Sequence, residues 1–273
     1  MSEPQKILLI GAGYGRTGTS SLVQALARVG LKSYHMKEGV FETPGHLDLW
    51  HEFLVQKSIT IDQVIDRITQ DGFNATADVP INIYYEPLMR RYPDARVILT
   101  LRKDGAEGWV KSMSESVFLF QPLLRRVPFR WIPRFIKQSE FLAAMGWGCM
   151  NTPVNPDTGL PVRDLMAAEY DRWTEQVKAT VPEDKLFVFY AHDGWEPLCQ
   201  FLSPLSPEIQ DNCKRVLDSG EPYPHVWEKE TIQRAVFTMN LLCSFVELSP
   251  FLVALCVLYR FSRSTKPKKD KSN

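Results

Sequence analysis

A glycine-rich segment, Gly11–Ser20 (GAGYGRTGTS), is the part of the sequence whose residue types most directly predict chemistry. It follows the short apolar run Lys6–Ile10 and leads into Thr19–Val29, where apolar residues recur at helical spacing. A glycine-rich turn from a strand into a helix presents backbone N–H groups and the positive end of the helix dipole to an anion. We therefore expect this loop to hold the 5′-phosphate end of a nucleotide.

The dinucleotide pattern GxGxxG fits the loop only in part. Gly13–Gly18 matches it, but the strand ends at Ile10, and in the register that starts at Gly11 the third glycine is replaced by Arg16. The acidic residue that binds ribose about twenty residues further on is also missing, because the second strand ends in Tyr-His-Met. An NAD-dependent epimerase or dehydratase is therefore only the second alternative function.

The Walker pattern GxxxxGK[ST] fits the same loop except at its lysine. Gly13, Gly18 and Ser20 are in place, and Thr19 replaces the residue that normally reaches the β- and γ-phosphates. The sequence thus keeps the geometry of a phosphate loop without the chemistry of a triphosphate.

Arg16–Ser20 (RTGTS) resembles the 5′-phosphosulfate loop of sulfotransferases, in which a basic residue precedes [ST]-G-[ST]. The chain is similar to the sulfotransferase superfamily over roughly residues 6–227, and specifically to a divergent family with GxGxGRTGT near its N-terminus, whose members are often mislabelled NAD-dependent epimerase/dehydratase. The resemblance implies a P-loop fold, 3′-phosphoadenosine 5′-phosphosulfate (PAPS) as cofactor, and sulfuryl transfer to a hydroxyl or amine of a small-molecule or lipid-like acceptor. The loop residues that it implies in cofactor binding are Gly15, Arg16, Thr17, Gly18, Thr19 and Ser20.

The resemblance implies a second cofactor contact, in which an arginine at a strand end and a serine in the next helix hold the 3′-phosphate. Arg102 ends the strand Arg96–Leu101, and Ser112 follows at a spacing two residues longer than usual. A guanidinium fork and a hydroxyl suit a phosphate dianion. The alternative for Arg102 is a surface salt bridge.

Acid–base residues are expected near the loop. The resemblance places Arg16 where a catalytic lysine usually stands, and arginine there acts by electrostatics alone because it does not readily give up a proton. Asp78 matches the position of the superfamily's base; its alternative is a turn cap before Pro80. His35 is the second candidate base, with a structural role as its alternative. Where the superfamily loop commonly continues into an adenine-stacking Trp, this chain has Ser21, which keeps open a non-catalytic nucleotide-binding or membrane-scaffold protein as the first alternative.

The elements that must position these residues alternate along the chain. Apolar runs predict buried strands and 3.6-residue spacing predicts helices between them, which indicates an open, mainly parallel α/β sheet with flanking helices. The predicted strands are Lys6–Ile10, Leu31–Met36, Phe73–Val79, Ala95–Leu101 and Leu186–Tyr190. Residues 1–230 are expected to form this domain, with a lid or insertion at about 119–161 that is rich in Pro, Arg and Trp.

The C-terminal part of the sequence differs from the rest. Residues 236–259 are mostly apolar, and such a helix is long enough to cross a bilayer core of about 30 Å. Glu247 and Pro250 interrupt the segment, so a hairpin entering from one side competes with a single span, and a buried hairpin within the fold is the other alternative. The basic tail 260–273 would stay cytosolic. The expectation is a membrane-associated protein with a cytosolic catalytic domain.

Composition excludes several classes of function. The 32 basic and 32 acidic residues of the 273 balance, which argues against general nucleic-acid binding. The five cysteines form no CxxC pair and no Cys/His metal spacing, so no metal is expected and ordinary thiols are the interpretation. The sequence does not indicate which acceptor is used.

Overall fold

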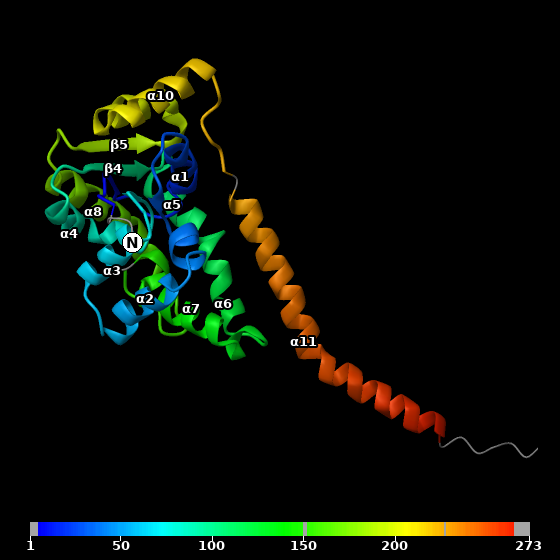
Figure 1. The fold of residues 1–273 in the computed structure, drawn as a ribbon. Coiled ribbons are helices and arrows are strands. Elements are labelled where there is room, and N and C mark those ends of the chain that lie inside the picture. The colour runs from blue at the N-terminus through cyan, green and yellow to red at the C-terminus, as the bar shows by residue number, and fades with distance from the viewer. Residues whose placement is uncertain (1–4, 150–151, 227, 265–273) are drawn as a thin grey trace, which may run out of the picture.

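A computed structural model describes residues 5–149, 152–226 and 228–264, and the surroundings of their side chains except at 228–229 and 251–264. Helices and short strands alternate along the chain (Figure 1). The strands are β1 (Leu9–Gly11), β2 (Ser33–Tyr34), β3 (Ala75–Thr76), β4 (Arg96–Leu101) and β5 (Leu186–Tyr190). The α-helices are α1 (Thr19–Arg28), α2 (His46–His51), α3 (Ile61–Gln70), α4 (Tyr85–Arg91), α5 (Gly105–Ser114), α6 (Phe120–Leu124), α7 (Pro133–Ala144), α8 (Arg163–Thr180), α9 (Trp195–Leu202), α10 (Pro207–Ser219) and α11 (Glu228–Ser264).

The strands of the described residues form one sheet in the order β2-β3-β1-β4-β5, and each neighbouring pair is parallel. This confirms the predicted α/β class with a parallel sheet and flanking helices. That the fold is specifically of the P-loop type stays a prediction.

Side chains that alternate along the strands build a core on each face of the sheet. Leu9 and Ile98 pack with α1, α9 and α10, whereas Ile10, Val97 and Leu99 point to the opposite side, where α3, α4, α5 and α8 pack. Successive residues of a strand face opposite sides, so continuous apolar runs are what a sheet covered on both faces requires. The sheet is therefore a rigid central layer between two layers of helices (Figure 1).

Parallel strands place their carboxyl ends at one edge of the sheet, where ligands bind in open α/β folds. The glycine loop leaves β1 there, His35 follows β2, Asp78 lies just beyond β3 and Arg102 follows β4. Four sequence-distant segments thus meet at the edge where the sequence predicts the site.

Within the predicted lid or insertion 119–161, the described residues up to 148 contain α6, α7 and short 3-10 turns, and those from 152 to 161 form turns without a helix. Helix α7 packs against α2, and α6 packs against α11 and α7. This segment adds walls beside the carboxyl edge of the sheet; its role as a lid stays a prediction.

The C-terminal segment is a single long helix, α11, which continues through Pro250 and extends away from the α/β domain (Figure 1). Neither the predicted hairpin nor the predicted span is found: within the described residues, no helix unites the length and the apolarity that crossing a bilayer requires. The membrane and transmembrane predictions are therefore wrong. The physical reason is visible in the first half of α11, where polar side chains interrupt the apolar ones: Arg126 of the domain donates to Asn240, Ser244 and Glu247.

The apolar residues in that half of α11 also divide between two faces. Cys243 is buried in a small core with Leu123 and Phe129 from the domain. Phe237 and Phe245, in contrast, are exposed. Residues 265–273 of the predicted basic tail 260–273, and the side chains of 251–264, lie outside the described residues.

Candidate active site

The backbone of the loop between β1 and α1 depends on its glycines. Arg16 and Gly18 both have left-handed backbone angles, with φ of 68° and 93°. A Cβ on Gly18 would also lie 2.7 Å from the Cβ of Ala191, so both space and conformation require glycine there. A Cβ on Gly13 would collide with Thr100 of β4. The glycines let the loop run close against the neighbouring strand.

Five consecutive loop carbonyls, from Ala12 to Arg16, accept hydrogen bonds from side chains. Their donors, in order along the loop, are Trp173, Asn82, Thr17, Trp109 and Arg102. The N–H and C=O of a trans peptide point in opposite directions. The loop amides of residues 13–17 therefore point away from these donors, which is the arrangement that an anion-binding loop needs.

Aromatic residues fix the loop from behind. The ring of Tyr14 stacks on Trp109 at 5.2 Å between centroids and lies 5.3 Å from Trp173. Its hydroxyl donates to Glu169 Oε1 at 3.1 Å, and Glu169 is held in turn by Arg172. Burial, together with the Glu169 carboxylate, raises the pKa of Tyr14 well above its usual value. Tyr14 thus remains a neutral donor, and the loop has little freedom to move.

The predicted cationic residues meet beside the loop. Arg16 Nε donates to Ser112 Oγ at 3.3 Å, and Arg102 Nη1 donates to the backbone oxygen of Arg16 at 2.9 Å. Despite its longer spacing, Ser112 reaches the loop. The Arg102 fork also binds Asp104 through two contacts of 2.7 Å, and this hydrogen-bonded pairing holds the pKa of Asp104 below its usual range. The salt bridge named as the alternative for Arg102 is therefore present alongside its contact with the loop.

Asp78 and His35, predicted as separate candidates, form one buried cluster. Asp78 Oδ2 lies 3.1 Å from His35 Nε2, which also lies 3.3 Å from Thr19 Oγ1 at the start of α1. Asp78 has a left-handed backbone (φ 68°), and its Oδ1 accepts from the Val79 N–H at 2.8 Å. The turn-cap interpretation of Asp78 is thus right for one oxygen, while the other oxygen faces His35.

Glycine at position 15 leaves the space that Asp78 uses. A Cβ there would lie 2.6 Å from Asp78 Oδ1, although the φ of Gly15 is not in the left-handed region. The requirement is therefore steric. The loop and the Asp78 carboxylate are in direct contact.

Glu38 completes the cluster at the other nitrogen of the imidazole. His35 Nδ1 lies 2.9 Å from Glu38 Oε2 and 3.3 Å from the Lys37 amide nitrogen. These contacts suit different protonation states, because a neutral Nδ1 accepts from Lys37 and a protonated one donates to Glu38. Burial tends to raise the pKa of Glu38, but the hydrogen bond and charge of His35 outweigh it and lower that pKa to about 2. Glu38 is thus a carboxylate positioned to stabilise a positive imidazole.

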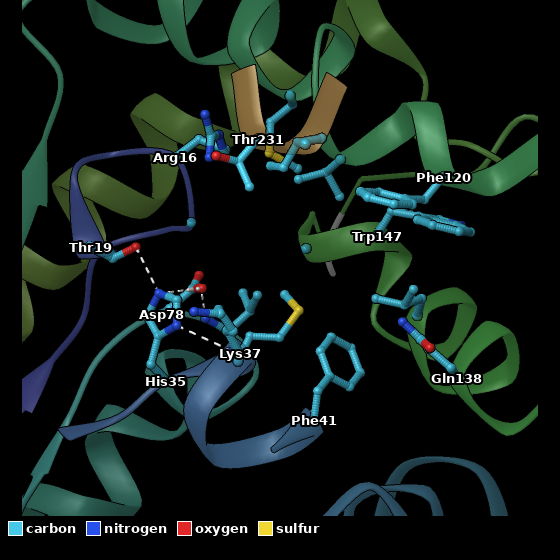
Figure 2. Close-up of a pocket in the computed structure, with 18 of the residues that line it drawn as sticks. Arg16, Thr19, His35, Lys37, Phe41, Asp78, Phe120, Gln138, Trp147 and Thr231 are labelled. Carbon is cyan, nitrogen blue, oxygen red and sulfur yellow. Dashed lines mark hydrogen bonds and ion pairs between the residues drawn. The ribbon is translucent and has the colours of Figure 1, made fainter. Parts of the chain in front are cut away.

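The cluster opens into a cavity of about 510 Å³ (Figure 2). Arg16, Thr19, His35 and Asp78 line one side. Figure 2 shows Phe120, Trp147 and Gln138 across the space from the His35–Asp78 pair. The site therefore joins a glycine-rich loop, a buried cluster of His35 with two carboxylates, and an apolar chamber.

Sequence reasoning missed the residues that hold the site in place. No sequence pattern singles out Trp109, Trp173 or Asn82, and only the fold shows that their N–H groups reach the loop. Glu38 carried one available signal, its position three residues after His35. Thr17 lies in the loop as predicted, whereas Ser20 lies in the first turn of α1. Contact of any of these residues with a cofactor stays a prediction.

Comparison with known proteins identifies similar sequences. A family model described as "Sulfotransferase domain" matches residues 8–232. A curated relative, "Ava biosynthesis cluster protein M" from Aspergillus versicolor, is 28% identical over 214 residues, which is 74% of this chain and 78% of that protein. Because the family model covers well over half of the sequence, the chain belongs to the sulfotransferase domain family.

Proposed function

We propose that this protein transfers a sulfuryl group from PAPS to a hydroxyl or amine of an acceptor. The observation that carries the proposal is the convergence of Arg16, Arg102 and Ser112 on a loop whose amides point away from the protein donors, directly beside the buried His35–Asp78 pair. Family membership supports sulfuryl transfer as the reaction class.

The residues present suit such a cofactor. The loop has no Cβ at positions 13 and 15, and its carbonyl oxygens there accept hydrogen bonds from protein side chains. Its backbone N–H groups are therefore left to bind a 5′-phosphosulfate. The guanidinium of Arg102 and the hydroxyl of Ser112 would hold the 3′-phosphate. Arg102 would then release the Asp104 carboxylate and bind the phosphate in its place. Bound PAPS would supply the sulfuryl group, with 3′,5′-adenosine bisphosphate (PAP) as the product.

The chain's own residues would do four things in the reaction. Arg16 neutralises negative charge beside the loop and keeps its proton. The His35–Asp78 pair takes the proton that the acceptor hydroxyl or amine loses, because the Asp78 carboxylate and the His35 imidazole lie 3.1 Å apart and face the cavity together. Glu38 at Nδ1 stabilises the imidazolium. The apolar chamber holds the acceptor and keeps water from the transferring group.

Isothermal titration with PAP tests the cofactor assignment. Wild type should bind PAP at sub-millimolar concentration, and Arg102→Ala should lose most of that affinity but much less affinity for adenosine 5′-phosphate, which lacks the 3′-phosphate. Wild-type protein that does not bind PAP in this range would refute the proposal. Equal losses for the two nucleotides would refute the 3′-phosphate role of Arg102.

A further inference from the structure

The cavity beside the loop has a small ionisable part and a larger apolar part. The ionisable side chains among its described lining residues are Arg16, His35, Lys37 and Asp78. The remainder is largely apolar and includes Phe41, Met113, Phe120, Leu142, Trp147 and Ile232, with Gln138 as a polar residue at the far side. Figure 2 shows Phe41, Phe120 and Trp147 around the open space that faces His35 and Asp78.

This division dictates how a molecule would lie in the cavity. A hydroxyl placed against Asp78 and His35 finds acceptors there, whereas additional hydroxyl or charged groups further in would lose water without finding partners. The volume of about 510 Å³ lies within the range of about 300–1,000 Å³ that is typical of pockets for drug-sized ligands. The cavity thus suits a molecule with one nucleophilic group and an apolar body.

One wall of the cavity comes from the C-terminal segment. The Val226 N–H donates to Ser21 Oγ at 3.2 Å, so Ser21, which stands where an adenine-stacking Trp was expected, ties this segment to α1. Val226, Thr231 and Ile232 then line the cavity. The family match ends at Ile232, so nearly all of α11 beyond this wall is outside it.

Further along, α11 is fastened to the same part of the domain that lines the cavity. Arg126 pairs with Glu247 at 2.7 Å and also donates to Asn240. Cys243 is fully buried in a core that includes Leu123 of α6, and Phe120 at the start of α6 both contacts this core and lines the cavity. The position of α11 therefore sets the shape of the apolar end.

We propose that the cavity is the acceptor site, that it takes an apolar alcohol or phenol with a single nucleophilic hydroxyl, and that the first turns of α11 form a specificity-determining wall of it. This inference rests on the proposed function for the reaction that follows binding. The binding itself requires only the cavity.

Two phenols that share the reactive group and differ in the body test the substrate class. We would titrate the full chain, without any nucleotide, with 4-butylphenol and with arbutin, whose para substituent is a glucose. Because the sugar hydroxyls would be buried without partners, arbutin should bind at least about tenfold more weakly. Equal affinities, or no 4-butylphenol binding at sub-millimolar concentration, would overturn the proposal.

Two substitutions on one helix test the wall. Ile232→Asp puts a carboxylate into the apolar cavity and should weaken 4-butylphenol binding at least about tenfold. Phe237→Asp makes the same kind of change at an exposed position of α11 and should leave the affinity within about twofold. If Ile232→Asp does not fold by circular dichroism, Ile232→Ala decides, with an expected loss of about threefold or more from lost apolar contact. An unchanged affinity in the folded Ile232 variant would overturn the role of α11.

The same protein samples separate this proposal from the proposed function. PAP binding by the Ile232 variants should equal that of wild type, because Ile232 is not among the loop contacts. Binding of 4-butylphenol by a wild type that fails to bind PAP would leave the apolar cavity intact and refute the PAPS assignment alone. PAP binding by a wild type that does not bind 4-butylphenol would support the PAPS assignment and refute the apolar acceptor site.

Discussion

Asp104 occupies the guanidinium fork that we assign to the 3′-phosphate, so the substitution Asp104→Asn should strengthen PAP binding. Both contacts between Asp104 and Arg102 measure 2.7 Å, and the side chains are 55% and 27% exposed. Asparagine has the same shape and is also a good residue at the helix N-terminus that position 104 precedes. The change therefore removes the competing charge with little effect on packing against Gly108.

The size of the effect follows from the exposure of the pair. Exposed ion pairs contribute about 0.2–1 kcal/mol, and this is the amount that a phosphate must offset when it displaces Asp104. Converted to affinity, Asp104→Asn should tighten PAP binding by between about 1.4-fold and fivefold at low salt. Adenosine 5′-phosphate, which does not need the fork, should bind both proteins equally.

Isothermal titration of wild type, Asp104→Asn and Arg102→Ala with both nucleotides would measure this. If Asp104→Asn weakens PAP binding as much as Arg102→Ala does, Asp104 orients the arginine and does not compete with phosphate. That result would refute the reasoning, whereas a gain specific to PAP would support both the fork and its ligand.

Three further predictions concern the loop, the histidine cluster and α11. Gly15→Ala should lower turnover at least about tenfold, because its Cβ would displace the Asp78 carboxylate 2.6 Å away; steady-state assays would show this, and unchanged turnover would mean that Asp78 is not needed where it lies. Glu38→Gln should lower the free energy of unfolding near pH 6 by up to about 1 kcal/mol, since Glu38 is 39% exposed. Because the folded-state pKa of Glu38 is lowered to about 2, this stabilisation is present above the unfolded pKa of about 4.5 and is lost as the pH falls toward 2. The free energies of unfolding of the two proteins, measured by urea titration, should therefore converge near pH 2. A difference that stays constant with pH would contradict the ion pair. Arg126→Ala should speed amide hydrogen exchange in α11 around 240–247 and leave the sheet unchanged, and equal exchange in both proteins would show that the fork does not hold the helix.

The sequence predicted β4 almost to the residue because Arg96–Leu101 is mostly apolar and is buried from its second residue onward. It predicted β2 and β3 too long, and the reason lies in the site. The run Leu31–Met36 pairs only at Ser33–Tyr34, because His35 caps the following turn, and Phe73–Val79 pairs only at Ala75–Thr76, because Asp78 adopts a left-handed backbone. The residues proposed for chemistry are those that end the strands.

The candidate site, like the strands, was predicted from the sequence only in part. The family resemblance identified Arg16, Asp78 and Arg102, and His35 was predicted from its place at the end of the second strand. That His35 and Asp78 contact each other depends on strand order, with β3 between β2 and β1, which the sequence does not contain in any local pattern. Misreading α11 as a membrane helix has a related cause, because counting apolar residues did not show that some of them pack on the domain while Arg126 engages the polar ones between them.

Transfer of label from [35S]PAPS to a panel of apolar phenols and amines, by wild type and by Asp78→Asn, tests the central claim most directly. We expect wild type to form a sulfated product and Asp78→Asn to be slower by about 10²- to 10⁴-fold, with PAP affinity within about threefold of wild type. Wild-type protein that binds PAP but transfers no label across the panel would favour the non-catalytic alternative. Full activity in Asp78→Asn would contradict the assignment of the His35–Asp78 pair as the proton acceptor.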